Sequence, residues 1–504
     1  MKKNISFLFT ILFLSASSLF SQNMDEQITF FKTYGDTAEN HFDQGYAILQ
    51  TEDGGYIVAG EYSRHYVGAP MHYYGDVYIL KTDEHGETIW TKIYGDPNIW
   101  EGAYSMDKSS GGGYIISAFR FDSQSYKLWI IKINSQGDSI WSKIYPVREG
   151  NCIKQTTDGG YVITGGFNDI YLLKIDNQGN TVWTKLYDHD SEREEGNYVQ
   201  QNSDGGYIIC GITEFPDARG LDIWIIKTDS KGDTLWTKAY GGDYIDEPHS
   251  IIETEDGGYF IAGAYTEEGE LGFEAHIWLL RTDSKGDTIL TKKINNGSWE
   301  DLGYSMKKTS DGGFIIAGET VYDNFDSDIY LIKLDEEGNY QWFSTIGCNL
   351  GRMGDEKHYR GIDIIETSDG GYTITGFEWI YIGWDEYMDL CLLKVNDKGQ
   401  ITDIDEIKTN NVLNYTLSQN YPNPFNPSTQ IKFQIPERGL VTLTIYDLLG
   451  KEVKVLIKEE KNKGTYMVNW DGKDKYGRTV SSGIYLYRLQ SGSMSLCKKM
   501  AFIK

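Results

Sequence analysis

The chain has 504 residues, of which 24% are charged and 14% aromatic, and its formal net charge at neutral pH is −27. A surface this acidic repels nucleic acid and excludes it as a partner. The charge is uneven, because residues 415–504 contain 14 Lys and Arg against 7 Asp and Glu. The acidity therefore belongs to the segment that precedes them.

The first 21 residues have the layout of a secretory signal peptide. Two lysines follow Met1, an apolar run extends from Ile5 to Leu14, and small residues occupy the stretch up to Ser21. This order of regions predicts export and the removal of residues 1–21. No later stretch reaches the roughly 18 uninterrupted apolar residues of a membrane-spanning helix, so we expect no transmembrane segment in the mature chain.

The five cysteines do not suggest a disulfide framework. Their number is odd and their spacing irregular, and a chain of this length can bury a core without cross-links. Cys210 and Cys391 lie in apolar segments, and we expect both in the core.

A Gly-Gly motif recurs seven times between residues 53 and 372. Each copy separates two segments rich in β-forming residues, which predicts a hairpin with Gly in its turn. The motif is DGGY in five copies, GGGY in the second and DGGF in the sixth. The copies begin at Asp53, Gly111, Asp158, Asp204, Asp256, Asp311 and Asp369.

A second hairpin signal follows each copy. An apolar run ends in Lys or Arg, and a Gly stands five residues later, where a positive φ suits a short turn. The next segment carries a Trp in five copies and Leu290 in another. Each unit thus predicts four strands, named a to d, over about 45–60 residues, the length of one β-propeller blade. The basic positions are Lys81, Lys132, Lys174, Lys227, Arg281, Lys333 and Lys394.

The seventh unit lacks strand d, and a matching strand stands at the other end of the repeat region. Asp403 occupies the Trp position after Gly399, whereas residues 28–35 (ITFFKTYG) match residues 89–95 (IWTKIYG), with Phe30 at the Trp position. We therefore predict an all-β fold, a seven-bladed β-propeller of four-stranded blades over residues 22–401. Its N-terminal strand would close the last blade and leave no open edge.

The repeated Trp after a turn Gly, as in SKGDTLW, resembles the tryptophan-docking repeats of quinoprotein-type propellers. The resemblance covers only this strand pair. It implies that each Trp packs between neighbouring blades. The sequence shows no residue constellation for a quinone, and we expect no cofactor.

The connections between strands b and c vary in length. From the first residue of the motif to the basic residue is 28 positions in copy one, 16 in copy three and 25 in copy seven. Variable loops on a rigid scaffold commonly bind ligands, and aromatic rings beside carboxylates suit sugars. The alternative is that these rings cover one another. The ligand-binding candidates are Tyr66, Tyr73, Tyr74, Trp379, Tyr381, Trp384 and Tyr387.

A carboxylate precedes strand a in several copies. Carboxylates repeated around a ring would lie near the mouth of the central channel, where a hard cation such as Ca²⁺ takes six to eight oxygen ligands. No DxDxDG spacing supports a metal, and an acidic, solvated rim is the simpler interpretation. The residues considered as metal ligands are Asp43, Glu101, Glu195, Asp246 and Asp301.

The sequence does not indicate catalytic residues. It contains no HExxH, GxSxG or P-loop motif, and among so many acids no carboxylate pair is singled out for glycoside hydrolysis. We expect a binding module for a glycan or a protein rather than an enzyme. The alternatives are an extracellular glycosidase or lyase that uses rim carboxylates, and a structural surface-layer component.

Residues 402–414 predict a polar linker, and residues 415–504 a separate small immunoglobulin-like β-sandwich. Its segments are, in order, NYPNPFNPST, IYDLLGKEV, WDGKD, SGIYLYRL and KKMAFIK. They resemble the type A C-terminal sorting domain of type IX secretion cargo from the Bacteroidetes and allied bacteria. The resemblance implies recognition by outer-membrane secretion machinery and passage through the periplasm to the cell surface or the medium. The alternative is an ordinary immunoglobulin-like adhesion module.

Overall fold

The computed structural model describes most of the chain between Thr29 and Ile503. The described residues are 29–35, 42–64, 74–122, 124–188, 193–214, 220–268, 273–295, 298–321, 327–347, 355–382, 385–401, 416–417, 420, 423, 425–435, 438–447, 451–461, 464–491 and 494–503. The predicted signal peptide and linker lie outside them. None of the described residues forms a helix that could cross a bilayer.

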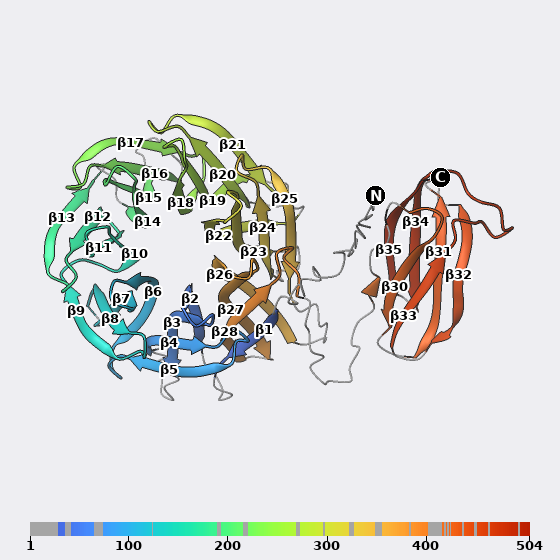
Figure 1. The fold of residues 1–504 in the computed structure, drawn as a ribbon, viewed down its shortest axis with the longest axis horizontal. Coiled ribbons are helices and arrows are strands. Elements are labelled where there is room, and N and C mark those ends of the chain that lie inside the picture. Colours follow the sequence, from blue (N-terminus) through green and yellow to red (C-terminus); the bar gives the residue numbers. More distant parts are fainter. Residues whose placement is uncertain are drawn as a thin grey trace, which may run out of the picture.

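Seven four-stranded antiparallel blades surround one axis, which confirms the predicted propeller (Figure 1). Blade 1 contains β2 (Asp43–Gln50), β3 (Tyr56–Arg64), β4 (Tyr74–Thr82) and β5 (Thr88–Tyr94). Blade 2 contains β6 (Trp100–Ser109), β7 (Gly113–Phe121), β8 (Tyr126–Asn134) and β9 (Ser139–Tyr145). Blade 3 contains β10 (Gly150–Gln155), β11 (Tyr161–Gly166), β12 (Ile170–Ile175) and β13 (Thr181–Tyr187). Blade 4 contains β14 (Glu194–Gln201), β15 (Tyr207–Glu214), β16 (Leu221–Thr228) and β17 (Thr234–Tyr240). Blade 5 contains β18 (Glu247–Glu253), β19 (Tyr259–Glu268), β20 (Phe273–Thr282) and β21 (Thr288–Ile294). Blade 6 contains β22 (Glu300–Lys308), β23 (Phe314–Val321), β24 (Ser327–Leu334) and β25 (Tyr340–Ile346). Blade 7 contains β26 (Asp355–Glu366), β27 (Tyr372–Ile382), β28 (Asp385–Val395) and the N-terminal β1 (Phe30–Tyr34).

In every blade strand a lies nearest the axis and strand d outermost (Figure 1). The N-terminal β1 is strand d of blade 7. It pairs antiparallel with β28, and Phe30 stands opposite Lys394 as Trp90 stands opposite Lys81 in blade 1. Phe30 is buried, and the Tyr34 hydroxyl donates a 2.5 Å hydrogen bond to a turn carbonyl of blade 1. The predicted closure of the ring is therefore confirmed.

Apolar side chains from both faces of each blade pack between neighbours. A separate buried cluster fills each successive interface, including the one between blades 7 and 1. The Trp of strand d belongs to these interfaces, since Trp236 of blade 4 contacts the Tyr259 ring of blade 5 with centroids 6.0 Å apart. Cys210 and Cys391 are fully buried and form no disulfide, as expected.

In six of the seven units the two sequence motifs meet in an ion pair that the sequence does not reveal. In blade 1 the Asp53 carboxylate accepts hydrogen bonds from Lys81 Nζ at 2.9 and 3.0 Å. Lys81 is buried, and the pair offsets the cost of burying its charge. Blade 2 has Gly111 in place of the Asp, and Lys132 bonds to Asn177 of blade 3 instead. The same pair occurs at Lys174–Asp158, Lys227–Asp204, Arg281–Asp256, Lys333–Asp311 and Lys394–Asp369.

The C-terminal residues form the predicted small β-sandwich. One sheet contains β29 (Thr416–Leu417), β30 (Thr429–Ile435) and β33 (Gly464–Trp470), and the other contains β31 (Gly439–Asp447), β32 (Glu452–Lys461), β34 (Gly483–Ser491) and β35 (Met494–Phe502). Trp470 is fully buried in the core between the sheets. Its indole N–H donates a 2.9 Å hydrogen bond to the Lys473 carbonyl, which holds the WDGKD turn.

Candidate functional site

All seven innermost strands carry a β-bulge at the same place in the repeat, at or before the middle of strand a in six blades and beyond it in β26. A bulge inserts one extra residue into a strand and redirects its side chain, and bulges are over-represented beside functional sites. The inserted residues form a ring around the axis with the composition of three Tyr, two Asn, one His and one Ile. They are Tyr46, Tyr104, Asn151, Asn197, His249, Tyr304 and Ile362. We call this set the bulge ring.

Bulge-ring side chains reach the neighbouring innermost strand. Tyr46 and Tyr104 meet edge to face with their centroids 5.7 Å apart, and His249 and Tyr304 meet in the same way at 5.3 Å. Asn197 Nδ2 donates a 3.0 Å hydrogen bond to a backbone carbonyl of β18. Aromatic and amide groups of the ring thus connect neighbouring innermost strands at these three places.

Charged groups from strands a and b support the ring. Tyr304 donates a 2.5 Å hydrogen bond to Glu319 Oε1, and Arg360 Nε donates one of 2.9 Å to Glu319 Oε2. Burial raises the pKa of Tyr304, so its hydroxyl stays protonated. Burial lowers the pKa of His249 to about 4, so this imidazole is neutral at physiological pH and offers one donor and one acceptor.

Glu61 of β3 lies at the same end of the propeller. Its side chain is buried, and its Oε1 accepts a 2.6 Å hydrogen bond from the Trp100 indole N–H. Burial raises the pKa of Glu61 to about 7, although Trp100 and Ser63 favour the charged form. A carboxyl group with a pKa near neutrality can act as an acid or a base, and burial also raises the pKa of Asp246, to about 6.

A buried ionic layer lies beyond the bulge ring, further along strands a. Asp363 of blade 7 accepts hydrogen bonds from Ser305 Oγ of blade 6 at 2.7 Å and from Ile48 N of blade 1 at 3.1 Å. It also pairs with Lys307 Nζ at 2.9 Å. Burial alone would lower the pKa of Lys307, but Asp363 outweighs it and raises that pKa. These bonds hold three blades together, and we assign the layer a structural role.

Four of the five predicted carboxylates before strand a are buried, and the expectation of a solvated acidic rim is wrong for these four. Each of these four carboxylates stands three residues before the inserted residue of its bulge, and each is at most 1% exposed. They are Asp43, Glu101, Asp246 and Asp301. Two of them bond to backbone amides of the d–a connections: Glu101 Oε2 accepts a 2.7 Å hydrogen bond from Asp96 N, and Asp246 Oδ2 accepts one of 2.7 Å from Gly242 N. Glu195 stands one residue further along and accepts a 2.9 Å hydrogen bond from Asn151 Nδ2.

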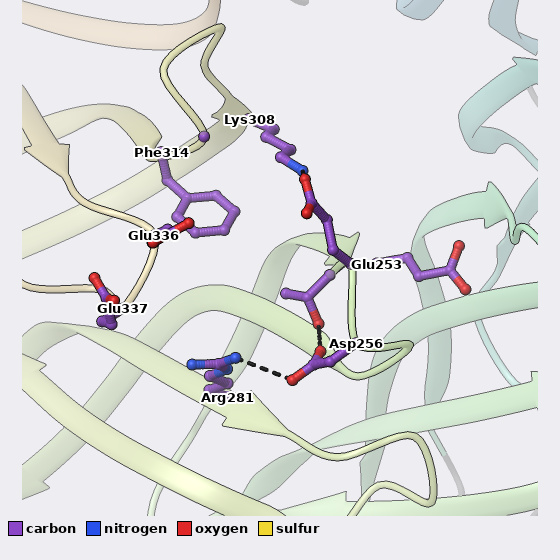
Figure 2. A pocket seen from close by; sticks show the side chains of 10 residues that line it. Glu253, Asp256, Arg281, Lys308, Phe314, Glu336 and Glu337 are labelled. Carbon is purple, nitrogen blue, oxygen red and sulfur yellow. Dashed lines mark hydrogen bonds and ion pairs between the residues drawn. The ribbon is translucent and has the colours of Figure 1, made fainter.

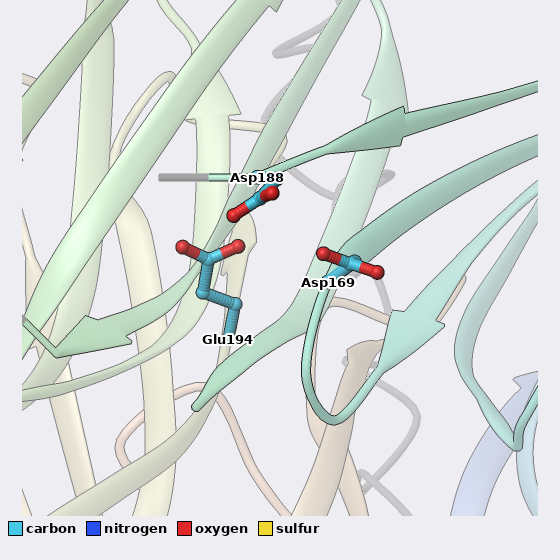
Figure 3. Close-up of side chains that lie close together, drawn as sticks. All are labelled: Asp169, Asp188 and Glu194. Atoms are coloured by element: carbon cyan, nitrogen blue, oxygen red, sulfur yellow. The ribbon is translucent and has the colours of Figure 1, made fainter. Parts of the chain in front are cut away.

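Three other carboxylates meet at the junction of blades 3 and 4 (Figure 3). Asp169 precedes β12, Asp188 follows β13 and Glu194 begins β14, and their ligand atoms lie within 4.8 Å of one another. This is the donor set among the described residues that could hold a hard cation. None of the three is among the metal ligands predicted from the sequence, because they share no motif or regular spacing.

The predicted aromatic loop residues are described only in part. Tyr66, Tyr73 and Trp384 lie outside the described residues, as do the side chains of Tyr74, Tyr381 and Tyr387. In blade 7 the predicted loop is a hairpin, since β27 and β28 continue to Ile382 and Asp385. The aromatic and β-branched residues there favour strand over loop. Trp379 is half-buried in β27, opposite Met388, with its ring 6.3 Å from that of His358.

Comparison with known proteins supports the C-terminal fold. The model of the FlgD Ig-like domain matches residues 425–494. No curated protein matches the chain.

Several solved structures are similar to the chain at low identity. A polysaccharide lyase of family PL25, an ulvan lyase, is 13% identical, with 73% of this chain and 97% of that one covered and a TM-score of 0.47. The WD40 β-propeller domain of Doa1 is 12% identical, with coverage of 72% and 96% and a TM-score of 0.44. PorZ, a surface component of the type IX secretion system of Porphyromonas gingivalis, is 9% identical, with coverage of 93% and 71% and a TM-score of 0.33. At these identities and TM-scores we transfer no function from these proteins to the chain.

Proposed function

We propose that the chain is a secreted or surface-displayed β-propeller that binds a glycan or a protein at the end of the axis where the bulge ring lies. The observation that carries this proposal is the bulge ring itself, seven side chains placed by the same backbone irregularity in seven blades. Three phenol rings, two amides and a neutral imidazole suit a sugar, whose apolar face stacks on rings while its hydroxyl groups bond to polar groups.

The C-terminal sandwich bears on where in the cell the protein acts. We propose that residues 1–21 direct export, that residues 402–414 link two units, and that residues 415–504 are a type IX sorting domain recognised by outer-membrane secretion machinery. The ordered motif resemblance supports this reading, and the sandwich fold agrees with it. The propeller would then act at the cell surface or in the medium.

A glycan array with the purified propeller tests the binding proposal. We expect saturable binding to one class of glycan, weakened in Asn151→Ala and Trp379→Ala variants. Phe343→Ala is the matched control, because Phe343 is 59% exposed on the outermost strand β25 of blade 6, away from the axis. The proposal would be refuted if no glycan on the array binds and if both site variants still bind the same proteins as the unmodified propeller.

An extracellular carbohydrate-active enzyme is the second candidate, and Glu61 is the observation that favours it. A carboxyl group with a pKa near 7 suits general acid–base catalysis. Turnover of a polysaccharide that disappears in Glu61→Gln, with the fold intact, would establish this function. A panel of acidic and neutral polysaccharides without turnover would exclude it for those substrates.

A further inference from the structure

The interface between blades 5 and 6 departs from the repeat. At the other interfaces an aromatic residue of strand d lies against the turn Gly of the next blade. A Cβ on that Gly would lie within 3.0 Å of the ring. Blade 5 has Leu290 at this position, and its methyl group is 3.8 Å from a Cβ on Gly338 of blade 6. The regular pairs are Phe30–Gly86, Trp90–Gly137, Trp141–Gly179, Trp183–Gly232, Trp236–Gly286 and Trp342–Gly399.

Two further departures stand beside Leu290. Phe260 occupies the second position of strand b, which is Ile, Val or Thr in the other blades, and its ring packs on Phe314 with centroids 4.6 Å apart. Arg281 replaces the Lys at the end of strand c and lies over the Phe260 ring at 5.8 Å. Its side chain is 25% exposed, whereas that of the equivalent Lys333 is 3% exposed. The guanidinium therefore stands nearer the surface than the ammonium groups of other blades.

A pocket of about 260 Å³ opens at this interface, and Arg281 lines it whereas Phe260 and Leu290 do not. The a–b turn of blade 5 brings Glu253 and Asp256 to it, and the c–d turn of blade 6 brings Glu336 and Glu337 (Figure 2). Phe314 lines it as well. The volume is smaller than the usual ~300–1,000 Å³ of drug-sized ligand sites, so it suits one extended side chain or a small amine.

The charges in the pocket are unbalanced. Arg281 pairs with Asp256 and Lys308 pairs with Glu255, each at 3.0 Å. Glu336 and Glu337 are exposed, and neither forms an ion pair with any described residue. No other c–d turn carries two consecutive carboxylates after its first residue. The pocket therefore combines two uncompensated negative charges with an aromatic wall.

We propose that this pocket binds an organic cation, an alkylammonium or guanidinium group, with its apolar stem against Phe314 and its charge at Glu336 and Glu337. Long cationic side chains bury their stems on apolar surface and keep their charge at a polar rim, which matches this arrangement. Such a group occurs on a basic peptide and on a polyamine. The site lies at the turn end of the propeller, opposite the bulge ring, and does not depend on the proposed function.

Calorimetric titration of the full chain at low salt tests the proposal with three probes: N-acetyl-arginine amide, spermidine and the neutral N-acetyl-glutamine amide. We expect saturable binding of a cationic probe and none of the neutral one. Tighter binding of the arginine amide indicates a peptide as the source, and tighter binding of spermidine indicates a polyamine. Binding of neither cation, or equal binding of the neutral amide, overturns the proposal.

Substitutions locate the site. We expect Glu336→Gln to weaken binding about threefold and the Glu336→Gln/Glu337→Gln pair about tenfold, as for exposed ion pairs. The matched control is Glu84→Gln, the same turn position in blade 1, which should leave affinity unchanged. Equal losses in Glu84→Gln and Glu336→Gln would refute the assignment to this pocket.

Discussion

Replacing Phe30 by Ala should test how far the N-terminal strand holds the ring closed. Phe30 is 8% exposed, contacts the Tyr56 ring edge to face at 6.1 Å, and belongs to the apolar cluster between blades 7 and 1. Buried Phe→Ala substitutions cost about 3–5 kcal/mol. We expect the lower end, about 3 kcal/mol, because an outermost strand can relax into the space left by the ring.

This loss converts into a measurable change of melting temperature. The entropy of unfolding is about 2 cal/mol/K per residue, so a propeller of this size unfolds with roughly 0.8 kcal/mol/K. A loss of about 3 kcal/mol then lowers the Tm by about 4 °C. Differential scanning calorimetry measures the shift, and hydrogen exchange should show faster exchange of β28 amides, which pair with β1.

The matched control is Phe343→Ala, which removes an equally large ring that is 59% exposed on strand d of blade 6. We expect it to change the Tm by less than about 1 °C. A second variant, deletion of residues 22–36, removes the whole strand and should destabilise the propeller more than Phe30→Ala does. An equal Tm shift in the two Phe variants, or an unchanged Tm in the deletion, would refute the closure argument.

Three other predictions concern ionisable groups and export. Burial opposes the charge of Asp311, but Lys333 and Thr309 outweigh it and lower its pKa to about 2. Asp311→Asn should therefore lower the free energy of unfolding by about 1 kcal/mol, a value discounted because the carboxylate is half-exposed. The difference between variant and parent should vanish as pH falls from about 4 to 2, measured by urea titration. The raised pKa of Glu61 has the opposite effect, because the folded state favours the protonated carboxyl group. The free energy of unfolding should fall by up to about 3 kcal/mol as pH rises from about 4.5 to 7. Glu61→Gln should make the free energy of unfolding nearly constant over this pH range. Deletion of residues 415–504 should leave a folded propeller in the periplasm by cell fractionation, and its appearance in the medium would contradict the sorting assignment.

The sequence predicted the blades because their signals are local. Alternating apolar residues, turn glycines and a recurring Trp depend on neighbours along the chain, and seven copies make each signal unambiguous. The partner of β1 was also predictable, since residues 28–35 repeat the strand d pattern and blade 7 has no other strand d.

The bulge ring was missed, although the sequence held a sign of it. Each member stands seven residues before the first residue of its Gly-Gly motif, from Tyr46 before Asp53 to Ile362 before Asp369. Aligning the copies on the motif would have brought these positions into one column. The inserted residue itself leaves no trace in spacing, because every copy carries the same insertion.

The sequence alone determined the all-β architecture, the number of blades, the closing strand and the separate C-terminal sandwich, because hydrophobic period and turn chemistry act between residues close in the chain. Only the tertiary structure decided which charges are buried and which groups meet. Glu101 and Asp246 were predicted to lie on an acidic rim but are enclosed, because backbone amides of their own d–a connections bond to them. Phe260, Leu290 and Glu336 are far apart in sequence and meet at one interface, because neighbouring blades place strand b, strand d and the next c–d turn side by side.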